Sequence, residues 1–86
     1  MKLTEGQSGI FNIVIDKTKR TLTTAVHDTA IVEASGLPSG EVDEYLRQLE
    51  GLGLITIDQK MSGATSRLVR ITKDGLLAAS EDQELL

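Results

Sequence analysis

The stretch SGLPSGEVDEYLRQLEGLGLI, residues 35–55, constrains the fold more than any other part of the chain. Gly36 can end one helix, because glycine adopts the left-handed conformation at little cost. Pro38 suits the first turn of the next helix, where its missing N–H is not needed. Three aliphatic side chains then recur at helical spacing: Val42, Leu46 and Leu49. We therefore predict two helices joined by a glycine-containing turn, with the second helix over 38–50 held by its aliphatic face.

The segment before this pair of helices is less clearly patterned. Thr4 and Gln7 have the spacing of a capping box, which favours a helix that begins there. The run IFNIVI, residues 10–15, has apolar residues at helical spacing but is also rich in β-branched residues, so the run alone does not distinguish a helix from a strand. The residues TLTT, 21–24, favour a short strand, and Asp28 is placed to cap the first helix of the pair.

The segment after the pair has the pattern of a β-hairpin followed by a helix. Residues 54–60 and 66–72 alternate between apolar and polar side chains, as half-buried strands do. A short turn that contains Gly63 joins them. Thr72 can cap a final helix over about 73–84.

Length and composition exclude several classes of protein. The 86 residues are enough for one domain over 1–86 but not for two. The chain has no cysteine, which excludes disulfides and cysteine-bound zinc. No apolar run approaches the roughly 18–20 residues that cross a membrane, so we expect a cytoplasmic protein. His27 is the single histidine and stands beside Asp28, but no nucleophile motif accompanies it. Nothing in the sequence therefore predicts an enzyme, a cofactor or a metal site.

The order of the predicted elements, with the residues AIVEASGLPSGEVDEYLRQLEGLGLITI at its centre, resembles the winged helix-turn-helix domain of bacterial and archaeal transcription regulators. The residues ITKDG, 71–75, are similar to the segment that leads from the wing into the last helix of such domains. The resemblance implies an α+β, mainly helical fold: a three-helix helix-turn-helix core, a β-hairpin wing and a C-terminal helix. It also implies a helix rather than a strand at residues 10–15.

The resemblance further implies a DNA-binding transcriptional regulator that contacts double-stranded DNA through the wing and the helix 38–50. Arg47 is the basic residue on the exposed face of that helix and is suited to a guanine edge, while Gln48 is suited to adenine. Backbone N–H groups at the start of the helix, with Ser39, are suited to a phosphate. The predicted DNA-binding residues are Ser39, Gly40, Arg47, Gln48, Lys60, Arg67, Arg70 and Lys73. We expect a homodimer, because the apolar residues of the first and last helices exceed what so small a core can bury.

The charge of the chain leaves a second interpretation open. The formal net charge is −4 and the sequence pI is about 4.8, whereas DNA affinity depends on neutralising phosphates with Lys and Arg. Glu41, Asp43 and Glu44 lie close together on the predicted DNA-reading helix. Acidic residues also suit the start of any helix, because they compensate its dipole. The alternative is a winged-helix module that binds a protein partner with a basic surface and does not bind DNA.

Overall fold

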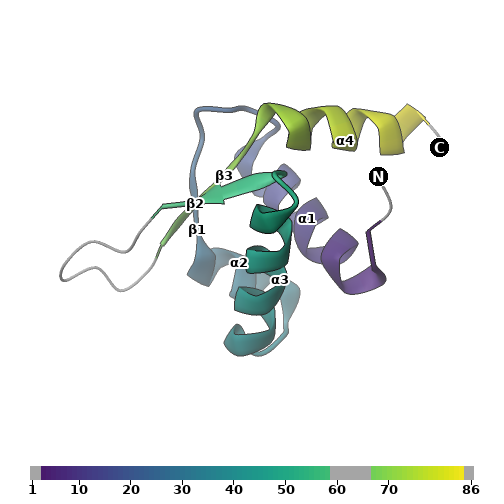
Figure 1. Ribbon diagram of the computed structural model, residues 1–86. Helices are drawn as coiled ribbons and strands as arrows, with labels where there is room; N and C mark the ends of the chain where they lie inside the picture. Colours follow the sequence, from purple (N-terminus) through teal and green to yellow (C-terminus); the bar gives the residue numbers. More distant parts are fainter. Residues whose placement is uncertain (1–2, 59–66, 85–86) are drawn as a thin grey trace.

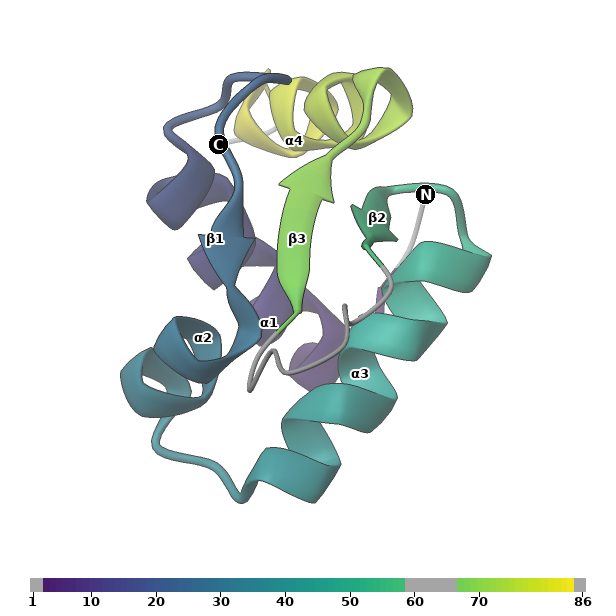
Figure 2. The ribbon, with the colours of Figure 1, turned by 90° about the vertical axis from the view of Figure 1, so that its left-hand side faces the viewer.

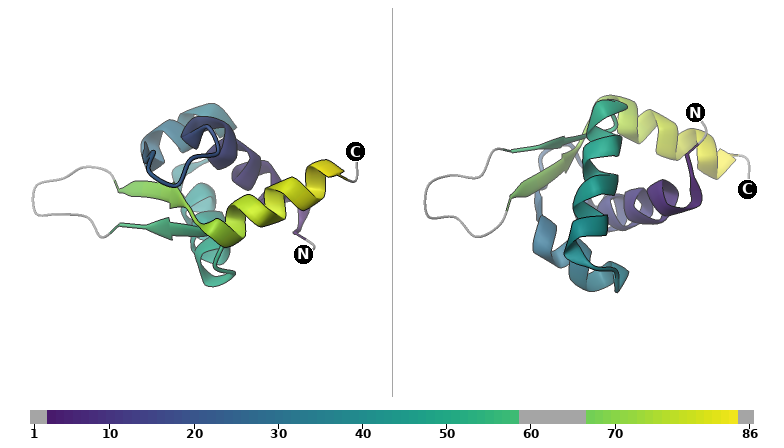
Figure 3. Two further views of the ribbon diagram at one scale, coloured as in Figure 1. Left: turned by 90° about the horizontal axis from the view of Figure 1, so that it is seen from above. Right: turned by 60° about the horizontal axis from the view of Figure 1, so that its bottom comes forward.

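The computed structural model describes residues 3–58 and 67–84. Four helices and three short strands follow one another along the chain (Figure 1). Their bounds are α1 Glu5–Thr18, β1 Val26–His27, α2 Asp28–Ser35, α3 Ser39–Gly51, β2 Ile55–Ile57, β3 Leu68–Ile71 and α4 Lys73–Glu84. Helices α1, α2 and α3 form one body beneath the sheet, and α4 extends from the sheet in the direction opposite to β2 and β3 (Figure 3).

Residues 10–15 belong to a helix, as the resemblance implied. The predicted capping box is present: the Thr4 hydroxyl accepts from the Gln7 N–H at 3.2 Å, and the Gln7 side chain accepts from the Thr4 N–H at 3.1 Å. These two bonds satisfy N–H groups that the first turn of a helix leaves without partners. Helical periodicity then buries Ile10, Phe11, Val14 and Ile15 in the core.

Helices α2 and α3 form the predicted helix-turn-helix, with two corrections at their starts. Gly36 ends α2 in the left-handed conformation, at a φ of 71°. Asp28 is the first residue of α2 rather than its cap; the cap position is His27, and the Asp28 carboxylate accepts a bond from the backbone of Arg67 instead. Pro38 precedes α3 in an extended conformation, so the helix begins at Ser39 and not at the proline.

The three strands form one antiparallel sheet in the order β1-β3-β2 (Figure 2). Ile55 pairs with Ile71 and Ile57 pairs with Val69, which confirms the predicted hairpin over the residues described. The strand expected at 21–24 was wrong, because the extended pairing is displaced to Val26, opposite Val69. Val26 is a buried apolar residue, whereas Leu22 is 47% exposed. Burial against β3 therefore decided where the strand lies.

The core lies between α1, α2, α3 and the inner face of the sheet. Its buried apolar side chains are Ile10, Phe11, Val14, Ile15, Val26, Ile31, Val42, Leu46, Leu49, Leu54, Ile55, Val69, Ile71 and Ala79. The three aliphatic residues predicted to anchor α3 are all within this set, each at most 2% exposed. Close packing of these side chains in the core therefore fixes the orientation of α3 and determines which of its faces is exposed.

Helix α4 begins on the turn between α3 and β2. The Thr72 hydroxyl accepts from the Gly75 N–H at 2.9 Å, as predicted for a cap, and donates to the Gly53 carbonyl at 2.6 Å. Gly75 is buried, and its backbone lies directly against the Leu54 carbonyl. Among the residues described, no helix combines the length and the apolar character that a membrane span requires.

Candidate nucleic-acid interface

The outward face of α3 presents four of the predicted DNA-binding residues. Ser39 and Gly40 lie exposed in its first turn, and Arg47 and Gln48 lie exposed in its second half. The opposite face of the helix carries the three aliphatic anchors, so packing alone determines which side chains point outward. Ser39 and Gly40 border a shallow depression between α2 and α3, and Asp28 and Asp43 line it too.

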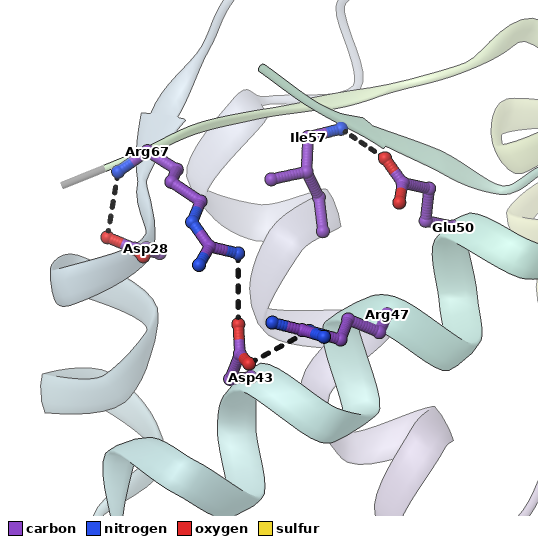
Figure 4. Close-up of polar contacts among 6 residues, drawn as sticks. All are labelled: Asp28, Asp43, Arg47, Glu50, Ile57 and Arg67. Carbon is purple, nitrogen blue, oxygen red and sulfur yellow. Dashed lines mark hydrogen bonds and ion pairs between the residues drawn. The ribbon is translucent and has the colours of Figure 1, made fainter. Parts of the chain in front are cut away.

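Asp43 connects this face to the wing, which we define as β2 and β3 with the adjoining residues Asp58 and Arg67. One carboxylate oxygen, Oδ2, lies 3.0 Å from Nε of Arg47, one turn further along α3. The other, Oδ1, lies 3.3 Å from Nη1 of Arg67, immediately before β3 (Figure 4). The side chains are partly exposed: 64% for Arg47, 38% for Asp43 and 34% for Arg67. A helix arginine and a wing arginine therefore converge on one carboxylate.

Arg67 is held at its backbone as well as at its guanidinium. Its N–H donates to Asp28 Oδ1 at 3.2 Å, and its carbonyl accepts from the Asp28 N–H at 3.0 Å. This reciprocal pair fixes the start of β3 on the start of α2. The position of the Arg67 guanidinium relative to α3 is thus set by two elements at once.

Arg70 lies on the other face of the wing. Side chains alternate along a strand, and Val69 and Ile71 are buried on the inner face, so Arg70 points outward. There it forms an ion pair with Asp58, which follows β2. Of the other predicted cations, Lys73 is exposed at the start of α4, and Lys60 lies outside the described residues. The structure therefore brings Arg47 and Arg67 together and leaves Arg70 on a different surface.

Three further basic residues lie close together at the end of α1: Lys17, Lys19 and Arg20. The segment that follows α1 passes beside α4, at the end of the molecule opposite the turn between α2 and α3 (Figures 1 and 2). This cluster is therefore not part of the surface formed by Ser39, Gly40 and the start of the wing.

The amino end of α1 contacts the outward face of α3. The Gln7 side-chain amide donates to the Gln48 side-chain oxygen at 2.8 Å. One residue earlier, a Cβ added at Gly6 would lie 2.3 Å from the Tyr45 hydroxyl oxygen. Glycine thus permits the Tyr45 ring to lie against α1. The amide oxygen of Gln48, the predicted adenine reader, already accepts one hydrogen bond from within the chain.

The carboxylates of this surface have structural partners that the sequence analysis did not identify. Asp28 and Asp43 each contact Arg67, and Glu50 accepts from the Ile57 N–H at 3.1 Å (Figure 4). On the opposite face of the wing, Asp58 contacts Arg70. Only the Asp43–Arg47 pair had a local signal, because residues four apart are neighbours on a helix. The others join residues that only the folded sheet brings together. The described residues hold no group of three or more His, Asp or Glu arranged for a metal ion.

This chain is similar to known proteins in structure but not detectably in sequence. No protein-family model matches the chain, and no curated protein matches it. Solved structures match with high structural similarity. MarR from E. coli, in complex with operator DNA, superimposes with a TM-score of 0.80 at 13% identity, over 98% of this chain and 56% of that one.

Two further structures extend this likeness. BpsR from Bordetella bronchiseptica, whose DNA binding is regulated by 6-hydroxynicotinic acid, matches with a TM-score of 0.76 at 21% identity, over 93% of this chain and 56% of BpsR. A putative DNA-binding protein from Ralstonia eutropha matches with a TM-score of 0.78 at 16% identity, over 93% of this chain and 96% of that one. The chain spans about half the length of the larger regulators. At these identities the comparison establishes the winged helix-turn-helix fold.

Proposed function

We propose that the protein is a cytoplasmic transcriptional regulator that binds double-stranded DNA through the outward face of α3 and the start of the wing. One observation carries the proposal: Arg47 of α3 and Arg67 of the wing lie on the same surface, joined through Asp43. A helix that enters the major groove needs exposed polar side chains on one face and a packed apolar face behind it, and α3 has both. The structural likeness to MarR, which was solved in complex with operator DNA, supports a DNA-binding role.

Each residue of this surface has a distinct role in the proposal. Arg47 and Gln48 lie where base edges are read, and Gln48 still has its amide N–H groups to donate. Ser39 and Gly40 bring the backbone N–H groups of the first turn close to a phosphate. Arg67 contacts the phosphate backbone beside the groove, and Lys73 adds positive charge at the start of α4. Lys60, outside the described residues, keeps the role that the sequence predicts for it.

The experiment that tests this proposal is a selection from random duplex oligonucleotides at low salt, followed by affinity measurements over a range of salt concentrations. Arg67→Ala should reduce the slope of log affinity against log salt by about 0.9, the value for one lost phosphate contact. Arg70→Ala is the comparison: the sequence predicts a DNA contact for Arg70 too, whereas its place on the opposite face of the wing predicts a smaller loss than for Arg67. Equal losses for the two variants would place the contact elsewhere, and an absence of binding at low salt would reject the function.

One observation favours the alternative role, a module that binds a protein with a basic surface. Arg47, Arg67 and Arg70 are each paired with an aspartate within the chain. Helix α3 also carries four carboxylates against one arginine. If the selection finds no DNA, Glu41→Gln and Glu44→Gln should weaken capture of a basic partner, measured by affinity purification followed by titration.

We also propose that the protein acts as a homodimer through α1 and α4, although one reason for expecting this was wrong. The run IFNIVI does not supply spare apolar surface, because only Ile13 of its five apolar residues is left partly exposed by the chain's own core. Helix α4 still presents Leu77, which is 55% exposed. Sedimentation at micromolar concentration tests the proposal: a dimer that Leu77→Glu dissociates supports it, and a clean monomer rejects it.

A further inference from the structure

We propose that Asp43 determines the specificity of DNA binding by competing with phosphate for the guanidinium groups of Arg47 and Arg67. The inference rests on the proposed function and adds a role for a residue that the DNA-binding surface would otherwise not require. The two guanidiniums are the cations that the structure places together between α3 and the wing.

The geometry gives Asp43 the position of an internal anion. Its two carboxylate oxygens are both engaged, one by each arginine, at 3.0 Å and 3.3 Å. Phosphate oxygens bind guanidinium groups with the same charge-assisted geometry. A duplex that approaches this surface therefore meets arginines that already have an acceptor. With Asp43, the cluster formed with Arg47 and Arg67 has a net charge of about +1. Without the carboxylate, the two arginines would present a net charge of about +2 to the duplex.

The exposure of the three side chains indicates that the exchange is feasible. All are more than 30% exposed, so the ion pairs lie in a high-dielectric environment. Exposed pairs of this kind change an equilibrium constant by at most about fivefold each, too little to prevent a well-placed phosphate from displacing the carboxylate. The ion pairs nevertheless lower the affinity for a duplex measurably when the duplex offers no other contact in exchange. Asp43 therefore reduces weak, sequence-independent binding more than it reduces binding at a site where Arg47 also gains a base edge.

Asp43 does not strengthen binding to the specific DNA sequence; it weakens binding to other sequences more. Specificity is a difference between two affinities, and it rises when the unwanted complex is made less stable. Most of the non-specific affinity for DNA comes from cations that neutralise phosphates. A carboxylate at the centre of the cationic surface lowers that term directly. It also explains why an acidic residue stands on the outward side of α3, beyond the general preference of a helix start for negative charge.

The test compares Asp43→Asn with Glu44→Gln on two duplexes, the selected sequence and an unrelated one. The two substitutions remove the same charge from neighbouring positions of α3, but Glu44 has no ion pair among the described residues. Asp43→Asn should raise affinity for the unrelated duplex about twofold to thirtyfold, as expected when two exposed ion pairs are released. Its salt slope should steepen by about 1–2. Affinity for the selected duplex should rise less, so that the ratio of the two affinities falls.

Glu44→Gln should raise affinity for the unrelated duplex by less than about threefold, because an exposed charge without a partner is largely screened. In an Arg67→Ala background, the gain from Asp43→Asn should be reduced. Equal gains for Asp43→Asn and Glu44→Gln would overturn the inference and leave the proposed function intact. A loss of affinity in Asp43→Asn would also overturn it, since Asp43 would then orient the arginines for DNA. If neither the parent nor the variants bind any duplex, the proposed function and the inference fail together.

Discussion

Replacing Gly75 by alanine tests how tightly α4 is docked on the rest of the chain. A Cβ at this position would lie 2.2 Å from the Leu54 carbonyl oxygen, 2.8 Å from Ile71 Cγ1 and 3.1 Å from the Leu54 carbonyl carbon. The first and third of these atoms belong to the backbone of the turn before β2, so no side-chain rotation relieves the clash. Either α4 or the turn must move.

The expected magnitude follows from two opposing effects. Forcing an additional carbon into a packed site costs about 1–3 kcal/mol, and contact with backbone places this site in the upper part of that range. Alanine gains up to about 1 kcal/mol over glycine from helix propensity. The net loss in the free energy of unfolding should be about 1–2 kcal/mol. For a domain of this size each kcal/mol lowers the melting temperature by about 4–8 °C.

Urea unfolding followed by circular dichroism measures the change, with the midpoint lowered and the m-value unchanged. Gly9→Ala is the matched control: Gly9 lies exposed inside α1, and a Cβ there meets no atom within 4 Å. That variant should gain about 0.5–1 kcal/mol from helix propensity. The same chemical change should thus have opposite signs at the two glycines. If Gly9→Ala is stabilised but Gly75→Ala is as stable as the parent, then α4 does not pack against the Leu54 carbonyl as described.

Two further predictions concern the ends of the helices. Thr4→Ala removes the capping box of α1 and should lower the free energy of unfolding by about 1 kcal/mol in the same urea assay, whereas Thr23→Ala, in the exposed segment after α1, should change it by less than about 0.5 kcal/mol. Asp28→Ala leaves the Arg67 N–H without its acceptor and should cost about 1–3 kcal/mol. Amide hydrogen exchange should then accelerate at Arg67, and unchanged protection there would contradict the reciprocal pair.

Local chemistry and periodicity predicted much of this fold. The capping box of Thr4 and Gln7, the left-handed Gly36 and the Thr72 cap each depend on neighbours within a few residues, and all three are confirmed. The aliphatic face of α3 is likewise a property of one helix. The winged-helix arrangement came from the resemblance and not from these local signals. The run 10–15 shows the limit of periodicity, because helix and strand patterns overlap in a short apolar stretch.

The parts that could not be predicted are those in which distant segments meet. Asp43 and Arg67 are separated by 24 positions, and Asp28 and Arg67 by 39, so nothing local marks them as partners. Asp28 was expected to cap α2 because aspartate suits that position, but tertiary contact with β3 uses its carboxylate differently. The opposite orientations of Arg67 and Arg70 depend on the register of the wing. The DNA-binding roles of the predicted residues stay predictions until binding is measured.

The contact between Glu50 and the wing has a consequence for self-association. β2 is an edge strand of the sheet described, and edge strands offer unpaired N–H groups to strands of other molecules. The Asp58 N–H donates to the Leu68 carbonyl, and the Leu54 carbonyl accepts from the Thr72 N–H. Because backbone groups alternate sides along a strand, the N–H of Ile57 points to the open side, where the Glu50 carboxylate accepts from it. A foreign strand would have to displace that carboxylate before it could extend the sheet. The last turn of α3 thereby protects the protein from fibrillar aggregation along this edge.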